Sequence, residues 1–228
     1  MIALYTAIGH LELKKNQDGN TMPTIINGHQ IYGMSDHEIV LWSCLAFQIL
    51  NIHELKAAYE LRLQKSDISE GAPFEYYLNR LLFRGLIAKG ESVTAVDALY
   101  RLLGVLQIYP VDESFLVRLF SCIFLCLKGK LKFKEIIKYL KEEKLTPVED
   151  TVLALTSRTI LTTAELITCI DKGIHISSEA DMLHTLYTDS KTTYSSLAKD
   201  VQIHHIQYPV LQAIGNLYLN KKIAFMRS

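Results

Sequence analysis

The sequence has no apolar run of 18 or more residues, the length that a membrane-spanning helix requires. The apolar stretch 115–127 is too short and contains Arg118. The first five residues, Met-Ile-Ala-Leu-Tyr, form no basic leader and contain no cleavage site. We therefore expect a protein that is neither inserted in a membrane nor secreted.

The chain also lacks an excess of charge of either sign, because 24 lysines and arginines balance 24 aspartates and glutamates. A dedicated nucleic-acid-binding protein usually carries a basic footprint, so this balance argues against strong nucleic-acid binding by the chain as a whole. Residues 128–144 are a local exception, with seven lysines against three glutamates and a net charge of +4. Such a segment is more typical of a solvated helix face, although it could dock phosphate or an acidic partner.

Cysteine is scarce, and no two cysteines form a C-x-x-C pair. The four cysteines lie in apolar helical contexts, at Cys44, Cys122, Cys126 and Cys169. This usage is typical of reduced, buried thiols in a cytoplasmic protein. Cys122 and Cys126 are one helical turn apart, but no histidine or aspartate lies near them, so buried packing is a better interpretation than a metal site or a redox bond.

Motifs of catalysis and cofactor binding are absent from the sequence. It contains no Ser-His-Asp order, no paired-carboxylate motif, no P-loop and no G-x-G-x-x-G. The neighbours His204 and His205 would point about 100° apart on a helix, and they lack the i, i+4 spacing that binds zinc well. We therefore predict no enzymatic activity, no cofactor and no bound metal.

Residues 73–90 carry the clearest local pattern that is present. Apolar residues recur on one side at a period of 3.6, and polar residues gather mainly on the other, which predicts a helix. Gly85 stands where a left-handed residue would end that helix. Leu86-Ile87-Ala88 then predicts a strand, and Lys89-Gly90-Glu91 predicts a tight turn.

Capping boxes mark several other helix starts, because a polar cap residue is followed three positions later by glutamate. These starts are Ser35, Asn51, Thr146 and Thr162. Trp42 falls on the inward face of the first capped helix, so we predict that it is buried. Apolar spacing predicts further helices over 94–107, 112–127, 132–143, 178–187, 194–200 and 204–219.

Residues 1–34 differ from the rest of the chain, because side chains alternate there at a period of two from Ile2 to Gly9. Asp18-Gly19-Asn20 and Asn27-Gly28 are hairpin turn signals. We predict a small antiparallel β-arm of two or three strands. An isolated hairpin is only marginally stable, so the arm should pack on the helical body or on another subunit.

The end of the chain repeats the spacing of its opening half. Residues 80–88 align with 216–224 at an offset of 136. A second alignment, at an offset of 142, pairs Leu41, Leu45 and Leu55 with Leu183, Tyr187 and Leu197. This pattern indicates two copies of one supersecondary unit, the first with a longer turn before its third helix.

The helix, glycine stop and strand of residues 78–90 resemble the last helix and first wing strand of a winged helix-turn-helix domain. The segment Tyr194–Val201 is similar to the second helix of such domains in bacterial transcription regulators. The resemblance covers residues 35–91 and 179–227. It implies DNA binding by the third helix and the wing, usually in a homodimer that matches a palindromic site. The same superfamily also contains many protein–protein modules.

The resemblance assigns candidate DNA contacts to both units. Those of the first unit are Tyr76, Asn79, Arg80, Arg84 and Lys89, with Phe83 on the same face. Those of the second unit are His205, Tyr208, Gln212, Lys221 and Lys222. Arginine can read guanine and asparagine can read adenine, while lysine on phosphate positions the helix. Because Glu75 and Glu91 lie beside the first surface, a solvated or protein-binding face remains the alternative there.

Together these patterns predict a mainly α fold with small β elements, in which tandem winged-helix-like units flank a helical middle. The predicted divisions are a β-arm (1–34), a first unit (35–110), a helical connecting region (111–175) and a second unit (176–228). The predicted function is that of a cytoplasmic, dimeric bacterial transcription regulator that binds duplex DNA. The alternative is a non-enzymatic protein–protein interaction module that uses the same faces.

Overall fold

The computed structural model describes residues 1–15, 21–66, 68–111, 144–187, 192–201 and 207–227. Its strands are β1 (Ile2–Ala7), β2 (His10–Lys15), β3 (Thr21–Asn27), β4 (Gln30–Gly33), β5 (Leu50–Asn51), β6 (Ile87–Ser92), β7 (Gln107–Pro110), β8 (Leu161–Thr162) and β9 (Ile223–Met226). Its helices are α1 (Asp36–Leu45), α2 (Ile52–Leu63), α3 (Phe74–Phe83), α4 (Ala95–Leu103), α7 (Pro147–Thr156), α8 (Thr163–Lys172), α9 (Glu179–Leu186), α10 (Tyr194–Val201) and α11 (Gln207–Leu219). The helices predicted over 112–127 and 132–143, with Cys122 and Cys126, lie outside the described residues.

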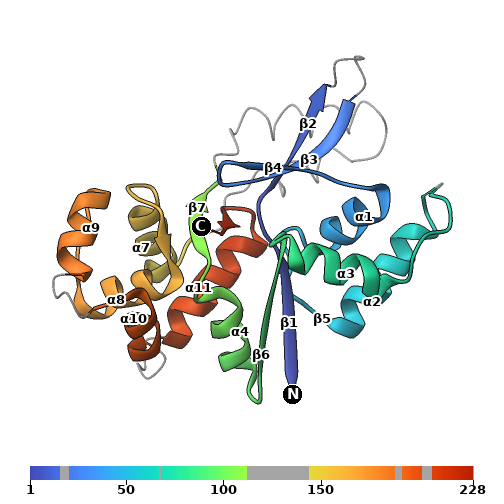
Figure 1. Cartoon of the computed structure of the whole chain (residues 1–228). Helices are drawn as coiled ribbons and strands as arrows, with labels where there is room; N and C mark the ends of the chain where they lie inside the picture. The colour runs from blue at the N-terminus through green and yellow to red at the C-terminus, as the bar shows by residue number, and fades with distance from the viewer. Residues whose placement is uncertain (16–20, 67, 112–143, 188–191, 202–206, 228) are drawn as a thin grey trace.

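The described strands form three antiparallel sheets of three strands each. About 50% of the described residues are helical and 22% lie in strands, so the fold is a mixture of α and β elements. In Figure 1, α1–α3 form one lobe and α7–α10 another, with β1, β6, α4 and α11 between them. The predicted combination of helices with small β elements is therefore present, with more strand than a mainly α fold would have.

The first of two similar units is built around β1, which is the central strand of the order β5-β1-β6. β1 pairs with β6 from Ile2 opposite Ser92 to Ala7 opposite Ile87. The other side of β1 pairs with the short strand β5, where Leu4 lies opposite Asn51. We define the first unit as β1, α1, β5, α2, α3 and β6. Its core contains the fully buried side chains of Leu41, Leu55 and Leu81.

The turn predicted at Lys89-Gly90-Glu91 is wrong, because β6 continues straight through these residues. Each of them pairs with β1, as Gly90 does with Leu4. The strand that accompanies β6 therefore comes from the start of the chain and not from a wing hairpin. After β6 the chain turns into α4, which packs across β6 and β1.

The second unit has the same strand order, β8-β7-β9, again with its first strand in the centre. Pro110 of β7 lies opposite Ile223, as Ala7 lies opposite Ile87 in the first unit. Gln107 lies opposite Thr162, as Leu4 lies opposite Asn51. We define the second unit as β7, α7, β8, α8, α11 and β9, with α9 and α10 inserted before α11. Strand β7 is not among the predicted elements, and its first residue, Gln107, falls within the helix predicted over 94–107.

The capping boxes give the two units a common framework. All four predicted boxes are present, with the glutamate side chain bonded to the backbone of the cap residue. Ser35 and Asn51 begin α1 and α2, and they are 16 residues apart (51 − 35). Thr146 and Thr162 begin α7 and α8 at the same separation (162 − 146). The equivalent helices are therefore α1 with α7 and α2 with α8, at an offset of 111.

The offset of 142 is therefore wrong, because it paired α1 and α2 with α9 and α10 instead. The apolar spacing of one amphipathic helix fits many others, whereas the strand register distinguishes between them. The offset of 136 agrees with the structure. Gly85 and Lys221 both have left-handed backbone angles, with φ of 69° and 57°. In both units the next amide donates to a carbonyl five residues earlier, Leu86 to Leu81 and Lys222 to Leu217.

The predicted β-arm contains four strands in place of two or three, and they belong to two sheets. Only β2, β3 and β4 form a separate sheet, and Figure 1 shows the β2–β3 hairpin projecting from the body. The turn predicted at Asn27-Gly28 is confirmed, because Asn27 pairs with Gln30 and Gly28 has a φ of 59°. The turn predicted at Asp18-Gly19-Asn20 lies outside the described residues.

The two units share a junction that contains buried polar contacts. The backbone N–H of Gly9 donates to the carbonyl of Phe225, which connects the end of β1 to β9. Tyr218 of α11 is 2% exposed, and its hydroxyl donates to the Leu45 carbonyl and accepts from the Phe47 amide. Trp42 is also buried, as predicted, and its indole N–H donates to the carbonyl of Ile8.

Candidate binding surface on the third helices

Helix α3 presents one exposed stripe of side chains on the side away from the core. Phe74, Tyr77, Leu78 and Leu81 are its buried residues. The opposite side exposes Tyr76, Asn79, Arg80 and Phe83, and Phe83 is 93% exposed. Tyr76 and Phe83 are seven residues apart, so they lie almost in line along the helix with the two polar residues between them. Three of the predicted DNA contacts thus share one face.

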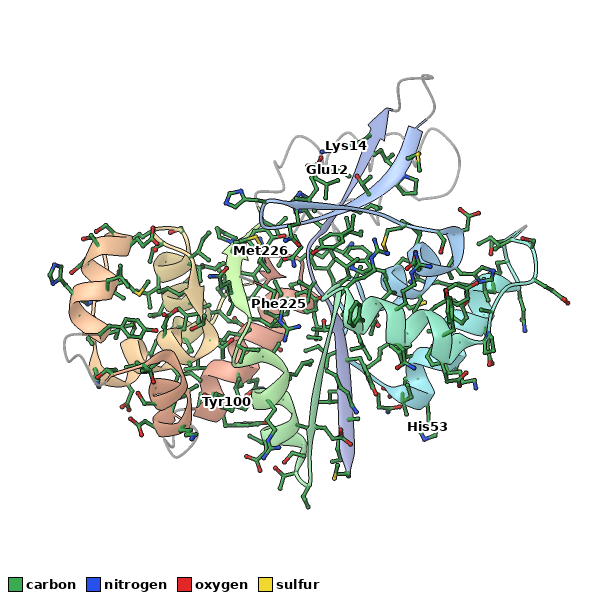
Figure 2. All side chains as sticks on the ribbon, in the orientation of Figure 1. Glu12, Lys14, His53, Tyr100, Phe225 and Met226 are labelled. Atoms are coloured by element: carbon green, nitrogen blue, oxygen red, sulfur yellow. The ribbon has the colours of Figure 1, made fainter. Side chains whose placement is uncertain are left out.

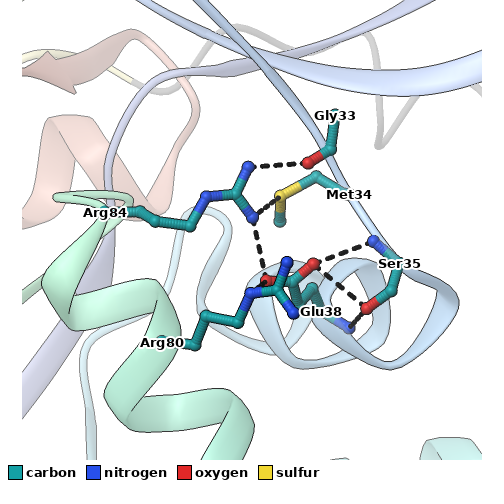
Figure 3. A network of polar contacts seen from close by, with 6 residues as sticks. All are labelled: Gly33, Met34, Ser35, Glu38, Arg80 and Arg84. Carbon is teal, nitrogen blue, oxygen red and sulfur yellow. Dashed lines mark hydrogen bonds and ion pairs between the residues drawn. The ribbon is translucent and has the colours of Figure 1, made fainter.

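A buried carboxylate forms ion pairs with the two arginines at the end of this helix (Figure 3). Glu38 is 1% exposed, and one of its oxygens lies 3.0 Å from Nε of Arg80 and 2.8 Å from Nη1 of Arg84. The other oxygen accepts hydrogen bonds from the backbone N–H and the hydroxyl of Ser35. Arg84 also donates to the carbonyl of Gly33, so its guanidinium group connects α3 to the residues before α1.

The ionisation of Glu38 follows from these contacts. Burial alone would raise the pKa of its carboxyl group, but the hydrogen bonds from Ser35 and the positive charges of Arg84 and Arg80 outweigh this effect. The pKa of Glu38 consequently lies below its ordinary value. Arg80 keeps about half of its side chain exposed, whereas Arg84 is largely covered.

The lysines around α3 are also engaged with carboxylates. Nζ of Lys89 lies 2.7 Å from Glu91, and this hydrogen bond raises the pKa of Lys89. Lys56 of α2 lies 3.1 Å from Glu75 at the start of α3. All the predicted cationic contacts of the first unit therefore have an acidic partner within the chain. Ion pairs at exposed positions are weak, so these lysines remain able to exchange partners.

The second unit exposes an equivalent but different face on α11. Tyr208, Gln212 and Lys221 are exposed and Lys222 is partly exposed, whereas His205 lies outside the described residues. Asn216 takes the place of Arg80, and its amide donates to Glu149, which is the counterpart of Glu38. Lys221 lies 6.0 Å from the ring centre of Phe47, across the junction. This face is neutral and polar, with its two lysines at one end.

The helical periodicity predicts the exposed residues of α3, but no sequence pattern predicts the carboxylate behind them. Glu38 was identified only as part of a capping box, although the same carboxylate binds Arg80 and Arg84 across 42 and 46 residues (80 − 38 and 84 − 38). The sequence holds one indication of this contact. The capping box at the start of α1 recurs at the start of α7, which suggests that its glutamate has the same role in both units. The identity of the partner could not be derived, because local patterns carry no information about the packing of α3 against α1.

The remaining surface offers less specific chemistry. A cavity of about 360 Å³ lies at the junction and is lined by Trp42, Phe47, Phe225 and His10, among others. Among the described residues, no group of three or more histidine, cysteine, aspartate or glutamate side chains could hold a metal ion. Cys44 and Cys169 are buried free thiols, and burial raises the pKa of each. No helix in the described ranges is both long and apolar enough to span a bilayer.

No family model, curated protein or solved structure matches the chain. The division into domains at residues 34, 110 and 175 also stays a prediction, although β1 pairs within the sheet of the first unit. The exposed stripe of α3 and the ion-paired charges around it are the basis for a functional proposal.

Proposed function

We propose that the chain is a protein-interaction module built from two winged-helix-like units, and that the exposed stripe of α3 is its principal binding surface. The observation that carries this proposal is the combination of an almost fully exposed Phe83 with arginines that are already bound by Glu38. A large apolar side chain in water is unfavourable, and its burial against a partner would stabilise a complex. The charged side chains around α3 would contribute much less to the stability of a complex, because most of them are neutralised by ion pairs within the chain.

The winged-helix likeness rests on the order of the elements in each unit. A first helix, a short strand, a second helix, a third helix and a longer strand follow one another in α1, β5, α2, α3 and β6. The missing strand of each small sheet is supplied by β1 or β7, from the N-terminal side of the unit. The first unit keeps the third helix as a prominent surface, but within the described residues β6 is followed by α4 and not by the second strand of a wing hairpin.

The spacing of the stripe favours a particular kind of partner. Tyr76, Asn79, Arg80 and Phe83 occupy positions i, i+3, i+4 and i+7, which is the pattern of a helix that lies in a groove of another protein. Aromatic residues and arginine are the side chains that contribute most to such interfaces. The expected partner therefore has two apolar pockets, about two helical turns apart, on either side of a polar or acidic centre.

Binding to duplex DNA is the second candidate, because Tyr76, Asn79 and Arg80 also form the face that a recognition helix would present to a major groove. Lys221 and Lys222 would contact phosphate in the second unit. If a dimer engaged about four to eight phosphates, the slope of log affinity against log salt would be roughly −4 to −7, at about 0.9 per phosphate. This dependence on salt distinguishes DNA binding from the proposed protein interaction.

A paired experiment tests the proposal. Displayed random peptides would be selected on the immobilised full chain and their affinities measured in solution. Fluorescence anisotropy would measure binding to random duplex DNA at several salt concentrations between about 50 and 200 mM, which gives the salt slope. We expect peptides that lose at least 10-fold in affinity with Phe83→Ser or Tyr76→Ser. The matched control is Leu61→Ser, which replaces an exposed apolar residue on α2 and should leave the affinity unchanged.

Two results would overturn the protein-interaction proposal. One is a peptide set whose binding is indifferent to both substitutions on α3. The other is micromolar binding to duplex DNA with the salt slope given above, weakened for every sequence by Lys221→Ala with Lys222→Ala. The second result would establish the DNA candidate in its place.

A further inference from the structure

Among the described residues, the outer edge of β2 has no partner strand, and it lies on a projecting hairpin (Figure 1). In the order β2-β3-β4, one side of β2 pairs with β3, and no strand within the described ranges pairs with its other side. Figure 2 shows Glu12 and Lys14 of β2 on this hairpin, away from the helical lobes. Exposed strand edges offer unpaired N–H and C=O groups to another strand, and proteins usually cover or blunt them.

The register with β3 shows which backbone groups face this free edge. Leu13 lies opposite Pro23, which has no N–H and therefore cannot form a hydrogen-bonded pair in an antiparallel ladder. Because the two kinds of pair alternate, Glu12 and Lys14 direct their backbone groups toward β3. The hydroxyl of Thr24 on β3 accordingly donates to the Glu12 carbonyl, at 3.1 Å. Leu11 and Leu13 thus direct their N–H and C=O groups outward.

The side chains of β2 from His10 to Leu13 are exposed, and that of Lys14 is partly exposed. Leu11 is 46% exposed and Leu13 is 69% exposed, and both lie on one face of the strand. Glu12 and Lys14 lie on the opposite face, where Glu12 is 3.3 Å from His10. The strand therefore combines free backbone groups, two unburied leucines and one charge of each sign within four residues.

We propose that two copies of this chain associate through β2, as antiparallel neighbours with Leu13 of one copy opposite Leu13 of the other. In that register Glu12 lies opposite Lys14 of the second copy, and Lys14 lies opposite its Glu12. Leu13 of each copy donates its N–H to the carbonyl of the other Leu13. The two β2–β3–β4 sheets become one continuous sheet, and the leucines of both copies gather on one face.

The charges select this register against its neighbours. Sliding one copy by two residues in one direction places Lys14 opposite Lys14. Sliding it by two residues in the other direction places Glu12 opposite Glu12. Like charges directly opposite one another destabilise a strand pair, whereas opposite charges stabilise it. A lysine on an edge strand commonly prevents that strand from pairing with another chain. Here Glu12 lies two residues from Lys14, so the edges of two copies carry complementary charges.

Self-complementarity is the reason to infer a second copy and not an unrelated strand. A twofold axis places the same patch on both partners, so residue 12 meets residue 14 twice in one interface. A foreign strand would have to carry the opposite charge order by coincidence. The interface leaves α3 and α11 uninvolved, so this inference does not depend on the proposed function.

Charge exchange in the full chain tests the register directly. Sedimentation equilibrium would be measured between 1 and 100 µM at low salt for the wild type, Glu12→Lys, Lys14→Glu, the double exchange and an equimolar mixture of the two single variants. The wild type should dimerise. Each single variant should dissociate at least 10-fold more readily, because it places only like charges opposite one another. The mixture and the double exchange should restore association, because both again place glutamate opposite lysine.

Matched controls separate this interface from a general effect of charge. Glu60→Lys and Lys65→Glu change the same charges at exposed positions on and after α2, and they should dimerise like the wild type. Circular dichroism would check that each variant remains folded. A wild type that is monomeric at 100 µM overturns the proposal, and so does a dimer that both single variants leave unchanged. Failure of the mixed variants to associate overturns the register.

Discussion

At the scale of single residues, the capping glutamates have two roles. Glu38 and Glu149 occupy the same position in their units, and each satisfies the backbone of its helix start. Each also contacts the third helix of its unit, through Arg80 and Arg84 in one case and Asn216 in the other. The first contact joins a carboxylate to two positive charges, whereas the second joins a carboxylate to a neutral amide. Burial would raise the pKa of Glu149, but the hydrogen bonds from Thr146 and Asn216 outweigh it and the pKa is lowered, without an opposite charge.

We predict that Glu38→Gln lowers the free energy of unfolding by about 2–3 kcal/mol at pH 7, because a charge-assisted contact to two arginines is lost. The pKa of Glu38 is lower in the folded chain than in the unfolded one. Its contribution is therefore fully present above the unfolded pKa, near about 4.3, and is lost as the pH falls through the folded value. Urea titrations of both proteins between pH 7 and pH 3 measure the difference.

The control for this prediction is Glu149→Gln. Asn216 can donate to an amide oxygen as well as to a carboxylate, so this substitution should cost only about 1 kcal/mol at pH 7. A difference between wild type and Glu38→Gln that stays constant from pH 7 to pH 3 would contradict an ionised Glu38 in the folded chain.

At the scale of elements, the packing of α4 on the first sheet depends on a residue without a side chain. A Cβ atom at Gly90 would lie 2.3 Å from the Ala98 carbonyl oxygen and 2.3 Å from the Leu102 nitrogen. Gly90 is therefore needed for the close approach of a helix to a strand, and not for a turn. The sequence could not distinguish these two uses, because glycine is common in both.

We predict that Gly90→Ala destabilises the chain by about 1–3 kcal/mol, because α4 must move away from β6 to accommodate the added methyl group. Gly33→Ala is the matched control, since no atom lies within 4 Å of a Cβ at that position. It should change the stability by less than about 0.5 kcal/mol. Thermal or urea unfolding of both variants tests this, and equal effects would show that α4 is not packed closely on β6.

Local signals in the sequence predicted much of the secondary structure. The capping boxes, the left-handed Gly85 and the buried Trp42 all depend on residues within one or two helical turns, and all were predicted correctly. The central position of β1 depends on its pairing with β6, across 80 to 90 residues (87 − 7 and 92 − 2). That of β7 depends on its pairing with β9, across 113 to 119 residues (223 − 110 and 226 − 107), so neither strand order was predicted. The candidate surface shows the same division, since exposure followed from helical periodicity but the Glu38 contacts did not.

At the scale of the whole molecule, the two units are joined by buried groups and not only by the chain. Ile8, the residue after β1, is fully buried in a core cluster made mostly of second-unit side chains. The Tyr218 hydroxyl contacts Thr6, Leu45 and Phe47 of the first half. Burial raises the pKa of Tyr218 to about 12, so the phenol stays neutral at any physiological pH. If one unit unfolded alone, the other would lose these contacts and would be destabilised.

We predict that Tyr218→Phe lowers the free energy of unfolding by about 1–3 kcal/mol, because the amide of Phe47 loses its buried acceptor. The chain has one tryptophan, so Trp42 fluorescence follows the first unit while circular dichroism follows both. The two signals should give coincident urea transitions in the wild type, and both midpoints should fall together in the variant. Tyr208→Phe, at an exposed hydroxyl, should leave them unchanged. If Tyr218→Phe lowered the fluorescence midpoint alone, the junction would not couple the units, and each would fold by itself.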